Sequence, residues 1–114
     1  MGKLEWRINK KKTVGKFPID VIEETLFALF CEQEKKTLPC IYPMREFKDT
    51  VREIKVNYLG DTYRTVYVVN LGKKIYVLHA FQKKSKTGIA TPKYEIDLIK
   101  KRLKELKQEL KEHK

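Results

Sequence analysis

The hydrophobic pattern changes its period along this chain, and each period predicts an element. Residues 4–8 alternate between apolar and polar side chains, which is typical of a short strand with one buried face. From Phe17 onward, apolar residues recur at the spacing of a helix: Ile19, Ile22, Leu26, Leu29 and Phe30. Because Pro18 suits a first turn, these positions predict an amphipathic helix from about Pro18 to Gln33.

The middle of the chain predicts an antiparallel meander. Residues 35–50 contain two prolines and show no clear period, so we expect a connecting loop there. Segments rich in Val, Ile, Tyr and Thr follow, and they predict three strands: Val51–Asn57, Thr62–Val69 and Lys74–Phe81. Short turns that contain glycine separate these strands, which favours antiparallel pairing.

The last part of the chain has the pattern of a long helix. Thr91 offers an N-cap, and Pro92 suits the first helical position. Apolar residues then recur every three or four positions: Ile96, Ile99, Leu103, Leu106 and Leu110. This spacing predicts a helix with a narrow apolar seam.

Together these elements predict an α+β fold. We expect one domain over residues 1–114, because this length and an apolar content of 41% suit one hydrophobic core. A small antiparallel sheet, made of the N-terminal strand and the three-strand meander, should pack with an N-terminal helix and a long C-terminal helix. No apolar run is long enough to span a bilayer and no leader peptide is indicated, so we expect a cytoplasmic protein.

The charge pattern indicates a polyanion as partner. Lys and Arg number 26 against 15 Asp and Glu, which leaves a net charge of +11. Residues 17–34 differ from the rest, because they hold five acids and no base. This polarity favours one surface for RNA and another for a different partner. The alternative for a charge run alone is a well-solvated surface.

Several kinds of active site are not indicated by the sequence. Cys31 and Cys40 lack the spacing and the His partners of a zinc site. There is no glycine-rich phosphate loop, no Ser-His-Asp pattern with supporting context, and no cluster of His and carboxylate residues. We therefore expect no metal site.

The strand register predicts a candidate site. If the first turn of the meander centres on residues 59–60, Lys55 faces Arg64. If the next turn centres on residues 71–72, Arg64 faces His79. Facing residues share one side of a sheet, so these residues would form a row, on the side that we expect the first helix to cover. Further basic residues follow the last strand beside this row: Lys83, Lys84 and Lys86.

Such a row matches the demands of RNA cleavage by the 2′-hydroxyl, which needs a base, an acid and cations for the phosphate. Arg64 suits the phosphate because its fork reaches two oxygens. Lys55 or His79 can move the proton, since His titrates near neutrality and a Lys among other cations has a lowered pKa. The alternative for His79 is a hydrogen-bonded core residue.

Two segments resemble a known family. Residues 51–67, with a Tyr-Arg-x-x-Tyr pattern at 63–67, look like the central hairpin of RelE-type toxins. The His-Ala-Phe-Gln-Lys-Lys sequence at 79–84 is similar to the phage-derived HigB-like branch of the RelE/ParE superfamily. The resemblance implies a compact RelE-like α/β fold and the toxin of a type II toxin–antitoxin system. It implies a metal-independent endoribonuclease, without a cofactor, that cleaves mRNA in the ribosomal decoding site.

The resemblance also implies partners and site residues. The partners would be mRNA on the ribosome and a helix-turn-helix antitoxin of the HigA type, which would form a hetero-oligomer with the toxin. Arg64 matches the family's phosphate-binding arginine, and Lys55 matches a basic residue of the preceding strand. The candidate RNA-binding residues are Lys55, Arg64, Lys83, Lys84 and Lys86, and the candidate catalytic residues are Lys55, Arg64, His79, Lys83 and Lys84.

Departures from the family pattern leave two other functions open. Glu53 stands where some members have a second Lys, and no residue matches the family's tail Tyr, so the general acid is unassigned. One alternative is a ParE-like inhibitor of DNA gyrase, because the fold is shared across the superfamily. The other is an RNA-binding module without chemistry. The acidic first helix and the apolar seam of the last helix are the expected antitoxin surfaces, unless both are core.

Overall fold

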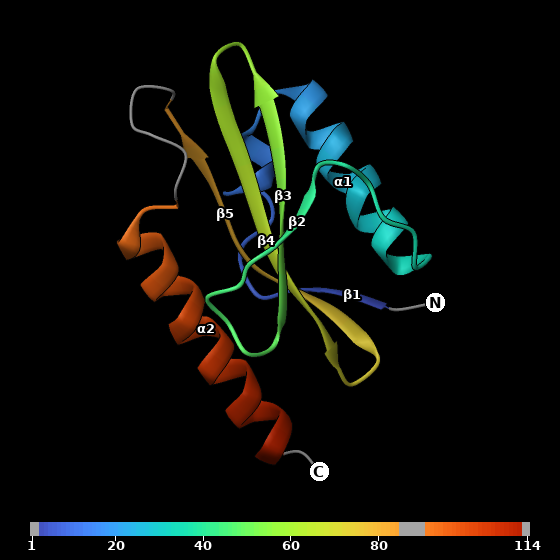
Figure 1. Cartoon of the computed structure of the whole chain (residues 1–114), viewed down its shortest axis with the longest axis vertical. Helices are drawn as coiled ribbons and strands as arrows, with labels where there is room; N and C mark the ends of the chain where they lie inside the picture. Colours follow the sequence, from blue (N-terminus) through green and yellow to red (C-terminus); the bar gives the residue numbers. More distant parts are fainter. Residues whose placement is uncertain (1–2, 85–90, 113–114) are drawn as a thin grey trace.

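The computed structural model describes residues 3–84 and 91–112, and Figure 1 shows their arrangement. In chain order the elements are β1 (Lys3–Trp6), the 3-10 helix η1 (Val14–Lys16), α1 (Ile19–Gln33), β2 (Ile41–Pro43), β3 (Thr50–Tyr58), β4 (Asp61–Leu71), β5 (Lys74–Lys83) and α2 (Lys93–Glu112). Pro18 lies directly before α1 and Pro92 directly before α2, where the missing amide hydrogen costs no helical hydrogen bond. Each predicted helix and strand is confirmed.

The strands of the described residues form one sheet in the order β1-β5-β4-β3-β2. Neighbours from β2 to β5 pair antiparallel, whereas β1 pairs parallel with β5 and places Leu4 beside Ile75. The α+β fold is confirmed, but the sheet is mixed and not antiparallel throughout. The alternation of apolar and polar residues indicates which face a strand buries and not the direction in which it runs.

The edge strand β2 lies inside the segment that was expected to be a loop. Ile41 pairs with Ile54 of β3, and Pro43 ends the pairing. Three residues are too few to show a period of two, and proline is tolerated at an edge because no neighbouring strand needs its amide. The prediction of a loop over residues 35–50 is therefore wrong for Ile41–Pro43.

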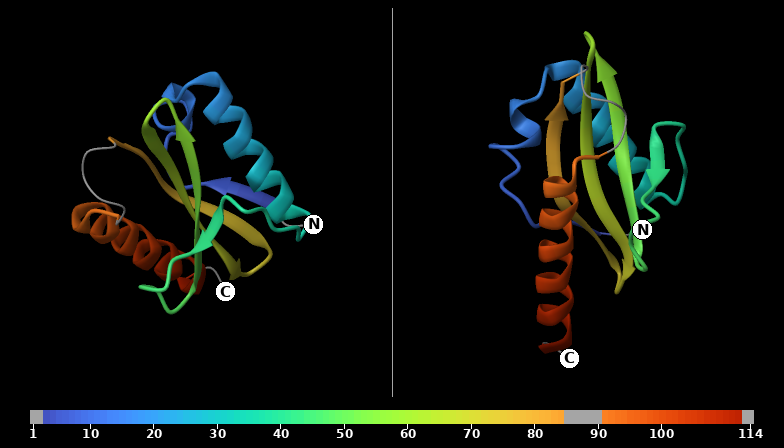
Figure 2. Two further views of the ribbon diagram at one scale, coloured as in Figure 1. Left: turned by 45° about the horizontal axis from the view of Figure 1, so that its top comes forward. Right: turned by 60° about the vertical axis from the view of Figure 1, so that its left-hand side comes forward.

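The helices cover opposite faces of the sheet, as Figures 1 and 2 show from several directions. The core on the α1 face includes Val21, Leu29, Ile54, Tyr67 and Val77. The core on the α2 face includes Val66, Val68, Leu78, Ile99 and Leu103. Because Lys55 and Arg64 alternate with the α1-face residues, they lie on the α2 face. The prediction that the first helix covers their face is therefore wrong.

The predicted row across three strands is confirmed in one half. Lys55 pairs with Arg64 as predicted. Arg64 lies opposite Phe81, however, and His79 lies opposite Val66. The prediction that Arg64 faces His79 is therefore wrong, although both residues share the α2 face.

The turn between β4 and β5 explains the difference. Leu71 pairs with Lys74, so the turn centres on residues 72–73, one position later than predicted. Gly72 has a positive φ of 76°, a conformation that favours glycine. Moving the centre of a hairpin by one position moves each facing partner by two. A further irregularity between Val66 and Tyr67 lets the strand twist, and such bulges leave no clear signal in the sequence.

Candidate active site

A buried carboxylate on β3 lies among basic side chains on the α2 face. Glu53 is only 5% exposed, and Arg64 on β4 is 3% exposed. Glu53 Oε1 lies 3.2 Å from Lys55 Nζ and 3.7 Å from Arg64 Nη1. Arg64 Nη1 also donates a hydrogen bond of 2.7 Å to Thr91 Oγ1, shortly before α2 begins. The group therefore lies where the start of α2 meets the central hairpin.

Lys83, at the end of β5, completes this group. It is 8% exposed and lies opposite Thr62, on the same face as Arg64. Burial lowers the pKa of the Lys83 ammonium, and the charges of Arg64 and Lys55 lower it further, whereas Glu53 acts in the opposite direction. We refer to Glu53, Lys55, Arg64 and Lys83 as the Glu53 cluster.

His79 belongs to a second group on the same face. Its Nε2 lies 2.7 Å from Glu95 Oε1, and its Nδ1 lies 2.7 Å from Arg102 Nη1. Because arginine carries only donors, Nδ1 accepts this hydrogen bond, and Nε2 holds the proton and donates to Glu95. Burial lowers the pKa of His79 against the raising effect of Glu95, which favours the neutral ring. We refer to His79, Glu95 and Arg102 as the His79 cluster.

The Glu53 cluster combines the features that phosphate chemistry needs. It has three cations against one carboxylate, so it attracts an anion. Glu53 Oε2 is buried and has no hydrogen-bond partner among the described residues. Glu53 can thus accept a proton and Lys83 can release one, and Arg64 lies on the strand between theirs.

Three of the predicted site residues come together in the structure. Lys55 and Arg64 contact the same carboxylate oxygen, and their charges act on the pKa of Lys83. Lys84 directly follows β5 and is exposed. Lys86 lies outside the described residues.

Sequence reasoning missed three residues that organise these groups. In the family pattern Glu53 counts as a loss of positive charge, yet its position two residues before Lys55 places both on one strand face. That spacing was the signal available in the sequence. Glu95 and Arg102 left no signal, because their contacts with His79 span 16 and 23 positions of the chain.

Across residues 3–84 and 91–112, no group of three or more His, Cys, Asp or Glu side chains lies close enough together to hold a metal ion. In the same ranges, no helix has the length and apolar character that crossing a membrane requires. Cys31 and Cys40 are both free thiols.

The chain matches a known protein family over most of its length. A family model described as phage derived protein Gp49-like (DUF891) matches residues 10–104. This range contains every member of the Glu53 cluster and of the His79 cluster. No curated protein and no solved structure matches the chain.

Proposed function

Because this chain belongs to the phage-derived Gp49-like family, which is associated with the toxins of toxin–antitoxin systems, we propose that it is a toxin that cleaves mRNA on the ribosome. The observation that carries this proposal is the Glu53 cluster, in which three cations surround one buried carboxylate. The net charge of +11 supports it, since such a charge speeds the approach to ribosomal RNA. The resemblance to HigB-type toxins supplies the reaction, which is cleavage by the 2′-hydroxyl.

Arg64 and Lys55 would hold the phosphate that is cut. The planar fork of Arg64 can donate to two phosphate oxygens at once. The hydroxyl oxygen of Thr91 now accepts one of its hydrogen bonds at 2.7 Å, and a phosphate oxygen would replace it. Lys55 lies on the neighbouring strand directly opposite, so both cations would reach one phosphate.

Glu53 and Lys83 would move the protons. Glu53 Oε2 would accept the proton of the 2′-hydroxyl while the 2′ oxygen bonds to phosphorus. The bond from phosphorus to the 5′ oxygen then breaks, and Lys83 donates a proton to that leaving oxygen. The lowered pKa of Lys83 makes its ammonium a better donor than an ordinary lysine. The products are a 2′,3′-cyclic phosphate and a 5′-hydroxyl.

His79 would position the site and not react in it. Both of its ring nitrogens are engaged by side chains of α2, and Arg102 also donates a hydrogen bond of 2.9 Å to the Leu78 carbonyl oxygen. These contacts hold α2 on the sheet. They thereby keep Thr91, two residues before that helix begins, beside Arg64.

The exposed face of α1 is the proposed surface for an antitoxin of the HigA type. Ile19, Phe27 and Phe30 are 72%, 57% and 52% exposed, although each is large and apolar. The acids Asp20 and Glu23 are exposed on the same helix, which holds no base. Such a face repels RNA and suits an amphipathic helix with basic side chains.

Expression of the chain without a partner tests the proposed function. It should stop growth, and primer extension should find new 5′ ends inside translated messages. Arg64→Ala should abolish both effects, whereas Lys101→Ala, an exposed residue of α2, should leave them unchanged. Growth arrest with intact messages and inhibited supercoiling by purified gyrase would contradict the proposal. RNA binding without new ends would contradict the cleavage step.

A further inference from the structure

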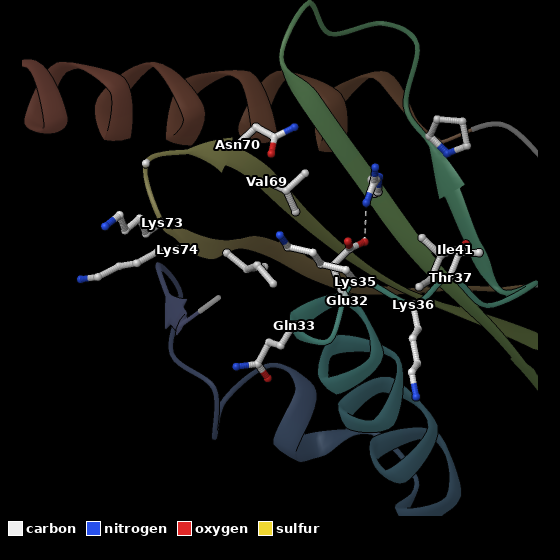
Figure 3. A pocket seen from close by; sticks show the side chains of 14 residues that line it. Glu32, Gln33, Lys35, Lys36, Thr37, Ile41, Val69, Asn70, Lys73 and Lys74 are labelled. Atoms are coloured by element: carbon white, nitrogen blue, oxygen red, sulfur yellow. Dashed lines mark hydrogen bonds and ion pairs between the residues drawn. The ribbon is translucent and has the colours of Figure 1, made fainter. Parts of the chain in front are cut away.

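An open pocket of about 850 Å³ lies on the α1 side of the sheet, and Figure 3 shows it from close by. Residues from the C-terminal end of α1, from β2 and from the turn between β4 and β5 line it. Its apolar part includes Ile41, Val69 and Ile75. Ligand pockets measure about 300–1,000 Å³, so this one can accept a ligand of several side chains.

The single acid of the pocket lining is already engaged. Glu32 Oε1 accepts a hydrogen bond of 2.6 Å from Arg52 and another of 2.6 Å from the Tyr67 hydroxyl. Tyr67 stays a neutral donor, because burial and the neighbouring Glu32 raise its pKa. The carboxylate of Glu32 therefore serves the fold, and Arg52 balances its charge.

The rim of the pocket is cationic. Five basic residues line the pocket against that one acid. Lys74 is held by Glu5 at 3.0 Å, but Lys35, Lys36 and Lys73 form no ion pair with any residue in the described part of the chain. In Figure 3, Lys35 lies near Glu32 and Val69, with Lys73 on one side and Lys36 on the other. These three lysines can therefore pair with a bound anion.

The lining favours a peptide over RNA. Of the described residues that line the pocket, none is aromatic, so bases find no ring on which to stack. The exposed acid Glu34 lies in the chain between the lining residues Gln33 and Lys35, and it would repel an extended chain of phosphates. A short acidic peptide avoids that repulsion, because its charges can be confined to the pocket.

We propose that this pocket binds a short acidic peptide segment of a partner protein. Carboxylates of the peptide would pair with Lys35 and Lys73, and an aliphatic side chain would pack on Val69 and Ile75. This proposal does not depend on RNA cleavage, because no member of the Glu53 cluster lines the pocket.

Fluorescence anisotropy of the full chain tests this site. The probe is a short fluorescein-labelled peptide in which Glu and Leu alternate, and control peptides replace each Leu by Ser or each Glu by Lys. The pocket variant is Lys35→Glu with Lys73→Glu. The matched variant is Lys101→Glu with Lys104→Glu, which changes the net charge equally on exposed positions of α2.

The Glu/Leu peptide should bind the natural chain, and the pocket variant should weaken binding about tenfold, whereas the matched variant should change it less than about twofold. Either control peptide should bind about tenfold more weakly. Equal weakening by both variants, or unchanged binding by the pocket variant, would overturn the proposal. The proposal would also be overturned if the pocket variant lost affinity for a labelled single-stranded RNA but kept its affinity for the Glu/Leu peptide.

The same variants separate this site from the proposed function. The pocket variant should still stop growth, because its substitutions lie on the other face of the sheet. Arg64→Ala should lose toxicity and keep its affinity for the Glu/Leu peptide. Loss of peptide binding by Arg64→Ala would overturn the pocket proposal, whereas retained toxicity would overturn only the proposed function.

Discussion

Two polar clusters lie on the same face of the same sheet, and they differ in how completely their atoms are paired. In the His79 cluster, Glu95 and Arg102 engage both ring nitrogens at 2.7 Å. In the Glu53 cluster, three cations surround one carboxylate, and Glu53 Oε2 has no hydrogen-bond partner in the described ranges. Buried polar groups that satisfy one another stabilise a fold, whereas excess charge beside an unsatisfied oxygen destabilises it until a ligand binds.

Pairing and charge, more than residue type, distinguish a reaction site from a group that only stabilises the fold. Histidine is a frequent catalyst, so residue type alone favours His79 over a buried glutamate. Pairing favours the reverse, since both ring nitrogens of His79 are engaged while Glu53 Oε2 has no hydrogen-bond partner among the described residues.

Arg64→Ala should produce the largest loss of activity. Removing a positioned donor to a developing negative charge typically costs about 10²- to 10³-fold in rate. The variant also leaves Glu53 without one of its cations, so the folded fraction should be measured by circular dichroism alongside mRNA cleavage. Arg64→Lys keeps the charge but loses the fork, and it should recover only part of the rate. Full activity of Arg64→Ala would show that the phosphate binds elsewhere.

Glu53→Gln should lower the cleavage rate by about 10²-fold, because the amide keeps the shape of the side chain and cannot accept the proton. Its affinity for RNA, measured by filter binding, should not fall, since the substitution removes a negative charge from the cluster. A rate equal to that of the natural chain would remove Glu53 from the reaction and leave it a structural role.

His79→Ala should affect stability and not chemistry. It leaves the buried Glu95 and the partly buried Arg102 without a shared partner, which should cost about 1–3 kcal/mol in the free energy of unfolding. Cleavage per folded molecule should stay within about twofold of the natural chain, as expected for a residue that makes no contact with substrate. If the rate fell as far as in Arg64→Ala while the protein stayed folded, His79 would be a catalytic residue.

Lys83 should set an alkaline limb in the pH dependence of cleavage. A proton donor works only while protonated, so the rate should fall as the pH rises through a pKa below the ordinary value of 10.5. Over the same window the fold should gain stability, because the unfolded chain binds this proton more tightly than the folded chain does. Lys83→Arg should abolish the limb, and an unchanged limb in that variant would assign it to another group.

The exposed pair of Glu5 and Lys74 should give the smallest effect. Its atoms lie 3.0 Å apart, closer than Lys55 and Glu53, yet water screens both charges. Lys74→Ala should therefore leave the midpoint of thermal unfolding and the cleavage rate unchanged. A marked drop in the midpoint would mean that the parallel pairing of β1 depends on this contact.

The sequence predicted much of the fold because long elements repeat their period many times. The helical spacing of α1 and α2 and the Val- and Tyr-rich runs of β3 to β5 were sufficient to locate them. β2 was too short to show a period, and the direction of β1 depends on contacts across 71 positions, between Lys3 and Lys74. Such pairings leave no trace in a local pattern.

The candidate site was predictable where a single turn determined it. The pairing of Lys55 with Arg64 followed from a short hairpin around Gly60, whose φ of 87° favours glycine. The position of His79 depended on the next turn, where an error of one position moved it away from Arg64. The burial of Glu53 goes with its contacts to Lys55 and Arg64 on the same face, and alternation along β3 does not reveal it.

Single-turnover cleavage of a labelled mRNA on programmed ribosomes tests the distinction between the two clusters most directly. The natural chain and His79→Ala, compared per folded molecule, should cut at similar rates and only when ribosomes are present. Arg64→Ala should be slower by about 10²- to 10³-fold. Equal rates for Arg64→Ala and the natural chain, or a loss confined to His79→Ala, would contradict the assignment of the reaction to the Glu53 cluster.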